Sequence, residues 1–453
     1  MSITRRALLA VPIPAALAAS TKAIDSYSFH HENILGTSLD LTVHAAKKGQ
    51  AEAAESLILT EIARLEAILS TYKPASEISR LNYAIQPFRC SHDLFALLSL
   101  YQRWSLATGG VISATPRSRK QLQLDSTTRT ANRPAGSAIN VDALGKAYIL
   151  DRAAARAIAE SGVSHLMLNI GGDIVFTQSP SAWTVGIANP ERSHDNATPL
   201  TSVAMHKGAI AASGSYARGP HIIDARTGKL APVSQSATAI APDAVTANAL
   251  ATALCVLSPQ AGISLVNAIP AVEALIVTSE SQFRTAHFAG FEQPILTPVA
   301  ANPNWPVAYE VAITITLKTP ENRGYRRPYV AVWAEDASGR TVRTIALWVN
   351  RPRWVRDLYA WYRTNQSTDW NSIARATREA GKYRIVWDGL DDNGHAVAAG
   401  TYKITVESDR EHGDYSKESA SIDCSAKKSS AILKENLEFE AGSIEFGPHT
   451  DKA

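Results

Sequence analysis

The stretch LGKAYILDRAAARAIAESGVSHLMLNIGG, residues 144–172, decides the fold class of the first half of the chain. Over 144–160 the apolar residues recur at steps of three and four, which predicts an amphipathic helix, and Gly162 ends it. The apolar run over 165–170 is short and precedes a glycine pair, which predicts a buried strand followed by a turn. A helix followed so closely by a buried strand indicates a mixed α and β body.

The neighbouring sequence shows the same mixture of periods. Apolar and polar residues alternate over 39–43, as in a half-buried strand. Helical spacing predicts helices over about 51–69, 94–104 and 245–257. We therefore expect an α+β body over 24–285.

The period changes to two in the last third of the chain. Alternation over 311–317 and 402–406, with turn signals such as Asn393-Gly394 between the strands, predicts an all-β sandwich over 307–447. Four prolines mark the preceding segment, 286–306, as a linker.

The composition excludes several classes of protein. The chain has 453 residues, of which 45% are hydrophobic and 19% charged, as in ordinary globular proteins. Its net charge of +3 is spread along the chain, so we expect no nucleic-acid partner. The three cysteines have no metal-ligand spacing and allow at most one disulfide.

The N-terminus has the pattern of an export signal. Residues 1–23 read MSITRRALLAVPIPAALAASTKA, with Arg5 and Arg6 before an apolar run and a small-residue cleavage pattern at Ala16-Leu17-Ala18. The pair of arginines fits a twin-arginine signal, and a Sec signal is the alternative. We expect a periplasmic mature protein without a transmembrane segment or a lipid anchor.

Four polar stretches of the first body contain the candidate functional residues. Each alone has an ordinary structural explanation, such as a turn for a glycine pair or solvation for a lysine at a helix start. The stretches are LSTYKPASEISRLN (69–82), NVDALGKAYILD (140–151), NIGGDI (169–174), and the group ASGSY (212–216), HIIDARTG (221–228) and Asn248 with Thr252.

Taken together and in this order, these stretches resemble the ApbE family of FAD:protein FMN transferases, from Gly36-Thr37 to about Ser279. The resemblance implies an α+β fold, FAD as substrate and Mg²⁺ as cofactor. It also implies transfer of FMN through a phosphoester bond to a Thr or Ser hydroxyl of an exported flavoprotein, with release of AMP.

The resemblance also implies roles for individual residues. The metal ligands map to the backbone of Gly145 and to the side chains of Asn248 and Thr252. Lys146 would act at the phosphates, and His221 or Asp224 would help to deprotonate the acceptor hydroxyl. The expected flavin- or adenine-contacting residues are Tyr72, Asn82, Gly171, Gly172, Asp173, Ser213 and Gly214.

One departure from the family bears on the chemistry. The family has an aspartate where this chain has Asn248, and the loss of a carboxylate weakens a magnesium site unless Asp243 or another acid compensates. Two alternatives to the transferase therefore stay open: a flavin-binding protein without transferase activity, and an FAD pyrophosphatase.

The C-terminal body resembles the predicted periplasmic domains of unknown function called DUF2271, through RRPYVAVWAEDASGRTVRTIALW and WDGLDDNG followed by GTY. The second motif is also similar to an immunoglobulin-like module, so we expect an immunoglobulin-like sandwich. Trp333, Trp348 and Trp387 are expected to fill its core.

Overall fold

The computed structural model describes most of the chain from residue 25 to residue 448. The described ranges are 25–118, 120–192, 194, 196–197, 199–215, 222–230, 233–293, 302–306, 308–318, 327–349, 352–366, 374–375, 377–378, 380–410, 413–425 and 427–448. The expected export signal lies outside them.

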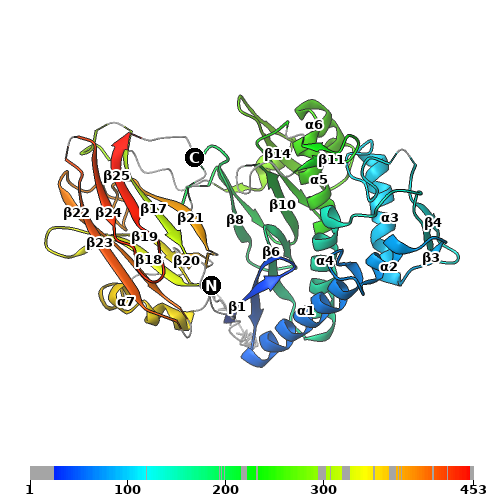
Figure 1. Cartoon of the computed structure of the whole chain (residues 1–453), viewed down its shortest axis with the longest axis horizontal. Coiled ribbons are helices and arrows are strands. Elements are labelled where there is room, and N and C mark those ends of the chain that lie inside the picture. The colour runs from blue at the N-terminus through cyan, green and yellow to red at the C-terminus, as the bar shows by residue number, and fades with distance from the viewer. Residues whose placement is uncertain are drawn as a thin grey trace, which may run out of the picture.

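An eight-stranded antiparallel sheet forms the centre of the first body, in the order β1-β2-β6-β7-β10-β13-β14-β15 (Figure 1). The expected strand over 165–170 is β6, which pairs with β2 and β7. The strands are β1 (Asp25–Ile34), β2 (Thr37–Ala45), β6 (His165–Ile170), β7 (Asp173–Phe176), β10 (Gly208–Gly214), β13 (Ser236–Ala241), β14 (Glu273–Val277) and β15 (Gln282–Arg284).

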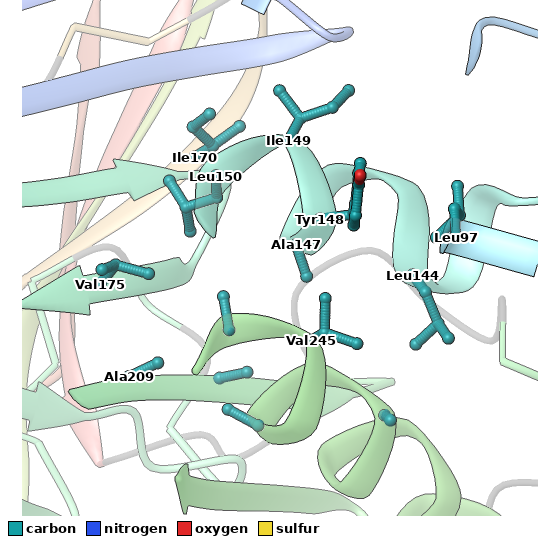
Figure 2. Close-up of a cluster of buried hydrophobic side chains, with 14 of the residues drawn as sticks. Leu97, Leu144, Ala147, Tyr148, Ile149, Leu150, Ile170, Val175, Ala209 and Val245 are labelled. Carbon is teal, nitrogen blue, oxygen red and sulfur yellow. The ribbon is translucent and has the colours of Figure 1, made fainter. Parts of the chain in front are cut away.

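Helices cover one face of this sheet, and the expected helices are confirmed among them. Their apolar stripes and the inward-facing residues of the sheet form one core, and Figure 2 shows the part between α4 and α5, around Ala147 and Val245. The helices are α1 (Lys48–Leu69), α2 (Glu77–Tyr83), α3 (His92–Ala107), α4 (Asp142–Glu160), α5 (Ala244–Val256) and α6 (Pro259–Asn267).

Helix α5 lies in the middle of this core. Its residues Ala247, Ala249, Leu250 and Ala251 are fully buried, and it contacts β10, β13 and α4. Alanines also face it from the sheet, for example Ala239 of β13, so the helix axis lies close to the strands. A helix enclosed in this way holds its few polar side chains in fixed positions.

The polar sequence of the segment 69–82 indicates a loop after the first helix, but helix α2 occupies its second part from Glu77 onward. Ser76 is the N-cap residue, and its hydroxyl accepts a hydrogen bond from the Ser79 amide. The apolar side chains Ile78 and Leu81 then face the core. Two apolar positions three residues apart are too few to show a helical period in the sequence.

A second layer covers the other face of the large sheet. The strands β8 (Trp183–Ile187), β9 (Thr201–Met205) and β16 (Glu292–Gln293) form a small sheet whose apolar side chains meet those of β10, β13 and β14. Because β16 pairs with β9, residues 292–293 belong to the first body, whereas the linker was expected to begin at residue 286. Two small sheets complete this body: β3 (Phe88–Arg89) with β5 (Thr130–Asn132) and β4 (Gln123–Asp125), and β11 (Ile223–Asp224) with β12 (Lys229–Leu230).

The second body consists of two sheets around one core, as expected for a β-sandwich. One sheet has the order β21-β17-β25-β24 and the other β20-β19-β18-β22-β23. The strands are β17 (Tyr309–Leu317), β18 (Tyr329–Glu335), β19 (Thr341–Trp348), β20 (Ala374–Arg375), β21 (Gly381–Trp387), β22 (Thr401–Asp409), β23 (Ser416–Asp423), β24 (Ser429–Leu433) and β25 (Gly442–Pro448).

Two of the three expected core tryptophans are confirmed. Trp348 and Trp387 lie between the sheets, whereas Trp333 belongs to a separate cluster on the outer face of β18. There it packs with Trp361 of the short helix α7 (Tyr359–Thr364), which covers that face. All seven residues of β18 are buried, because both of its faces are covered.

Asn196 connects the two bodies. Its side-chain amide donates to the carbonyls of Ile345 and Val386, at 3.1 and 2.7 Å, and accepts from the Val386 amide at 3.0 Å. These backbone groups belong to β19 and β21, so one side chain of the first body binds both sheets of the second.

The cysteines Cys90, Cys255 and Cys424 are buried thiols without a disulfide. Among the described helices, none combines the length and the apolar character that crossing a bilayer requires.

Candidate active site

A cavity of about 660 Å³ opens in the first body, where α4, α5, the β6–β7 turn, the end of β10 and the β11–β12 hairpin meet. Three of the four sequence stretches contribute to it. Its lining consists of Val111, Ile112, Ser113, Pro116, Arg117, Asn140, Asp142, Ala143, Lys146, Ile170, Gly171, Gly172, Asp173, Ala212, Ser213, Gly214, Ile222, Ile223, Ala225, Gly228, Asn248 and Thr252.

The β6–β7 turn places Asp173 at the cavity wall. Gly171 and Gly172 have φ of +63° and +102°, a conformation that side chains disfavour, and a Cβ on Gly171 would lie 2.9 Å from the Thr37 side chain. The Asn169 side chain accepts a hydrogen bond from the Gly172 amide at 3.0 Å. The turn is therefore fixed on both sides.

Asn248 of α5 reaches across to Asp173. Its Nδ2 lies 3.0 and 3.1 Å from the two carboxylate oxygens. The Oδ1 atom of Asn248 is buried and has no hydrogen-bond partner among the described residues. Because Asn248 lines the cavity, this oxygen is an unsatisfied acceptor beside it.

Two carboxylates bind the first turn of α5. Asp243 is the N-cap and accepts from the Thr246 amide, and Asp151 accepts from the amides of Ala244 and Val245 at 2.9 and 3.1 Å. Burial raises the pKa of Asp151 to about 7, although the two N–H donors act in the opposite direction. The amides of this turn are thus already bound, and Asn248 and Thr252 are held one helical turn apart.

Ser213 and Thr252 meet at the cavity. Their hydroxyl oxygens lie 3.4 Å apart, and the Ser213 carbonyl accepts from the buried Cys255 thiol at 3.3 Å. Gly214 follows Ser213 as the last residue of β10 and also lines the cavity.

The start of α4 places Lys146 at the cavity, one turn into the helix. The amides of Asp142 and Leu144 are bound by the Asn140 side chain and by the Tyr101 hydroxyl, at 2.8 and 3.0 Å. These amides are not open to an anion, so the positive charge comes from the Lys146 side chain. Gly145 lies inside α4 and is not among the lining residues.

The β11–β12 hairpin holds Asp224 away from the lining. The Arg226 guanidinium binds both of its carboxylate oxygens, at 2.8 to 3.1 Å, and thereby lowers the pKa of Asp224. A carboxylate with a lowered pKa is a weak base, so this geometry does not favour the expected role in deprotonation. His221 lies outside the described residues.

Tyr72 and Asn82 do not line the cavity. The Asn82 side chain pairs with the backbone of Ile139, donating at 2.9 Å and accepting at 2.7 Å, and so holds the segment that leads to Asn140. Tyr72 is 86% exposed. Their contact with a flavin or an adenine stays a prediction.

Arg117 is a cavity residue that the sequence analysis missed. Its φ is +64°, which is unusual outside glycine, and its amide donates to the Ala225 carbonyl at 2.7 Å. A Cβ on Gly228 would lie 2.3 Å from the Arg117 side chain, so the two residues pack tightly. The only sequence signal was the basic run Arg117-Ser118-Arg119-Lys120.

Comparison with known proteins agrees with this arrangement. The model of the ApbE family matches residues 35–118 and 113–276, which together make up more than half of the chain. The chain belongs to the ApbE family. A second model, described as "Predicted periplasmic protein (DUF2271)", matches residues 310–440. The two matches fall on the two bodies, hereafter the ApbE domain and the β-domain.

Individual relatives point the same way. The FAD:protein FMN transferase of Klebsiella pneumoniae is 23% identical over 300 residues, which cover 55% of this chain and 84% of the relative. The corresponding protein of Haemophilus influenzae is 23% identical over 279 residues, with 51% and 80% covered.

Solved structures show the same fold for the ApbE domain. The ApbE protein of Thermotoga maritima aligns with a TM-score of 0.52 and 22% identity, covering 59% of this chain and 100% of that one. The flavin transferase ApbE of Vibrio cholerae aligns with a TM-score of 0.51 and 18% identity, covering 59% and 99%.

The oxygen atoms at the cavity fit a hard divalent cation in part. The ApbE domain offers the unpaired Oδ1 of Asn248, the hydroxyl of Thr252 and the carboxylate of Asp173, and magnesium prefers oxygen ligands. No cluster of three or more His, Cys, Asp or Glu side chains suited to a metal occurs in the described part of the chain. Besides the Asp173 carboxylate, a cation here would therefore depend on neutral oxygens and on phosphate oxygens of the substrate.

Proposed function

We propose that this protein transfers FMN from FAD to a Thr or Ser hydroxyl of an exported flavoprotein. The hydroxyl oxygen attacks the FMN-side phosphorus of the pyrophosphate and forms a phosphoester bond. The bond from this phosphorus to the bridging oxygen breaks, AMP leaves with that oxygen, and the hydroxyl proton is released. The proposal rests on the ApbE family and on the names of its relatives.

The cavity is the observation that best supports it. Segments 140–146, 169–173, 212–214 and 248–252, which carry the family resemblance, meet around one space of about 660 Å³. Binding sites for small molecules have volumes of about 300–1,000 Å³. A pyrophosphate placed there would face two cationic side chains, Lys146 and Arg117.

These cations have separate parts in the proposal. Lys146 projects from a helix whose first turn is already hydrogen-bonded, so its ammonium group would bind phosphate oxygens as a point charge. Arg117 offers a planar fork of donors suited to a phosphate. Charge that develops on the leaving AMP would thus be stabilised by groups already in place.

We assign the cation site to Asn248, Thr252 and the backbone of Gly145. A bound magnesium ion would neutralise charge on the pyrophosphate. Asn248 Oδ1 and Thr252 lie one turn apart on a helix that the core encloses, so they would be in position before binding. Gly145 is the least supported of the three, because it does not line the cavity.

The acceptor hydroxyl also needs a proton acceptor. We propose His221 for this part, since Asp224 is engaged by Arg226. Asp224 would then act by holding the hairpin whose residues Ile222, Ile223 and Ala225 border the cavity.

We further propose that the protein acts in the periplasm after export by a twin-arginine or Sec signal, where it meets its acceptor. The description of the DUF2271 model supports this location. The β-domain would be immunoglobulin-like, and its two facing antiparallel sheets around Trp348 and Trp387 support this assignment.

One assay separates the proposal from its two alternatives. The full mature chain is incubated with FAD and MgCl₂, with and without a peptide of the pattern Asp-x-x-Ser/Thr-Gly-Ala-Thr, which the family resemblance implies for the acceptor. AMP is measured by chromatography and the peptide by mass spectrometry. A peptide with one FMN added supports the transferase, AMP without a modified peptide indicates the pyrophosphatase, and bound FAD without AMP indicates a flavin-binding protein.

A further inference from the structure

We propose that Asp173 supplies the carboxylate of the divalent-cation site in this chain, a part that the family resemblance gives to position 248, and that Asn248 orients it. This inference rests on the proposed function and deepens it, because it names the ionised ligand of the cation.

The hydrogen bond fixes which atom of Asn248 faces Asp173. A carboxylate only accepts hydrogen bonds, so the amide nitrogen must lie toward it, at 3.0 and 3.1 Å from its two oxygens. The amide oxygen is then left buried and without a partner in the described part of the chain. Asn248 thus offers one neutral oxygen ligand and holds a charged group beside it.

The pair also explains how the site can hold a negative charge with a neutral residue at position 248. An aspartate at position 248 would place a second carboxylate about 3.0 Å from that of Asp173, where the Asn248 amide lies now. Two negative charges at that distance repel each other unless a proton or a cation lies between them. With Asn248 the pair is attractive without a cation, and the Asp173 carboxylate still lines the cavity.

The position of Asp173 suits a ligand. It is the first residue of β7, directly after the glycine turn that Asn169 and Thr37 fix. Asn248 and Asp173 both line the cavity, as does Thr252. A carboxylate, an amide oxygen and a hydroxyl on rigid elements form the kind of ligand set that Mg²⁺ accepts, with water and phosphate oxygens completing it.

Binding of Mn²⁺, a spectroscopic substitute for Mg²⁺, tests the proposal without any measurement of FMN transfer. The full mature chain without FAD is titrated with Mn²⁺, and free Mn²⁺ is counted by electron paramagnetic resonance, with Mg²⁺ as competitor. The variants are Asp173→Asn, Asn248→Asp and the double variant that exchanges the two residues. Asp142→Asn is the matched control, because it removes one negative charge from the same cavity wall.

We expect Asp173→Asn to weaken Mn²⁺ binding about tenfold or more, and Asp142→Asn to change it by less than about threefold. The double variant should bind Mn²⁺ again, since it returns a carboxylate to the site and keeps a hydrogen-bonding pair. Asn248→Asp should bind more tightly than the native protein, because it adds a second carboxylate.

Native-like Mn²⁺ binding by Asp173→Asn overturns the proposal, as does an equal loss in Asp142→Asn. A double variant that melts like the native protein but binds no Mn²⁺ overturns it as well. The proposed function is tested separately, by the FMN-transfer assay. If the native chain transfers FMN but Mn²⁺ binding does not depend on Asp173, only this inference is removed. If Mn²⁺ binding depends on Asp173 but no FMN is transferred, the inference about Asp173 is supported and only the proposed transferase function is removed.

Discussion

Two asparagines, one in each domain, have opposite environments. Asn302 at the edge of the β-domain core donates to the carbonyls of Gly389 and Val397, both at 2.9 Å, and accepts from the Asn304 amide at 2.8 Å. Asn248 in the ApbE domain binds another side chain and leaves its buried oxygen without a partner. A saturated amide stabilises a fold, whereas an unsatisfied one beside a cavity indicates a ligand.

The two domains should differ in the same way. In the ApbE domain the polar groups of the cavity should control activity and contribute little to stability. In the β-domain buried polar groups such as Asn302 should control stability alone.

The largest effect is expected at Lys146. Replacement by methionine removes the charge and keeps the length, so FMN transfer should fall about 100-fold or more, the loss typical of a group that stabilises transition-state charge. The melting temperature should stay near that of the native protein. Lys48→Met, on the exposed side of α1, is the control and should leave transfer unchanged. Transfer at the native rate in Lys146→Met would remove Lys146 from the site.

The next effect concerns stability. Asn302→Ala deprives two carbonyls and one amide of their partner, which should lower the free energy of unfolding by about 2 kcal/mol, without loss of FMN transfer. Urea unfolding followed by tryptophan fluorescence measures it, since Trp305 and Trp387 lie in the same core. Asn304→Ala, an exposed neighbour that shares the Val397 carbonyl, should cost less than about 1 kcal/mol. Equal losses in both variants would contradict the saturated-amide interpretation.

A pH-dependent effect is expected at Asp151. Its pKa is raised to about 7 in the folded protein, from an ordinary value of 3.8, so the unfolded chain releases the proton first as the pH rises. The contribution of Asp151 to stability should therefore decline between about pH 4 and pH 7. Asp151→Asn should remove this decline, which amounts to a few degrees in melting temperature.

Asp224 provides the opposite sign as a control. Its pKa is lowered by Arg226, so its contribution is present above the unfolded pKa and disappears as the pH falls through the folded pKa. Asp224→Asn should therefore lower the melting temperature above about pH 4 and leave it unchanged at low pH, where the native carboxylate is protonated in the folded and unfolded states alike. A native-like decline from pH 4 to pH 7 in Asp151→Asn would show that another group titrates there.

The smallest effect is expected from Gly228. A methyl group there would displace the Arg117 side chain, which should raise KM for FAD about three- to tenfold. Gly136→Ala is the matched control, because Gly136 has a similar φ, +75° against +71°, but no atom within 4 Å of an added Cβ. The two variants should lose similar stability, and only Gly228→Ala should change KM. An equal rise of KM in both would mean that Arg117 does not bind FAD.

The sequence by itself determined the two-domain division, most helices and the central strands. Long apolar periods such as those of 51–69, 144–160 and 311–317 depend only on which residues repeat, so they can be recognised without tertiary contacts. The order of the polar stretches also determined the family, which the comparisons confirmed.

The tertiary structure alone decided how these stretches work together. It showed that α2 forms within the expected loop and that Trp333 lies outside the sandwich core. It also placed Arg117 at the cavity and showed that the Arg226 guanidinium binds the Asp224 carboxylate. From the sequence, Asn248 could be recognised only as the residue that replaces the aspartate of the family. Its partner Asp173 lies 75 residues earlier in the chain, and only the packing of α5 against the sheet brings the two within 3.0 Å. Hydrogen bonds act over a few ångströms in space, and sequence separation does not report that distance.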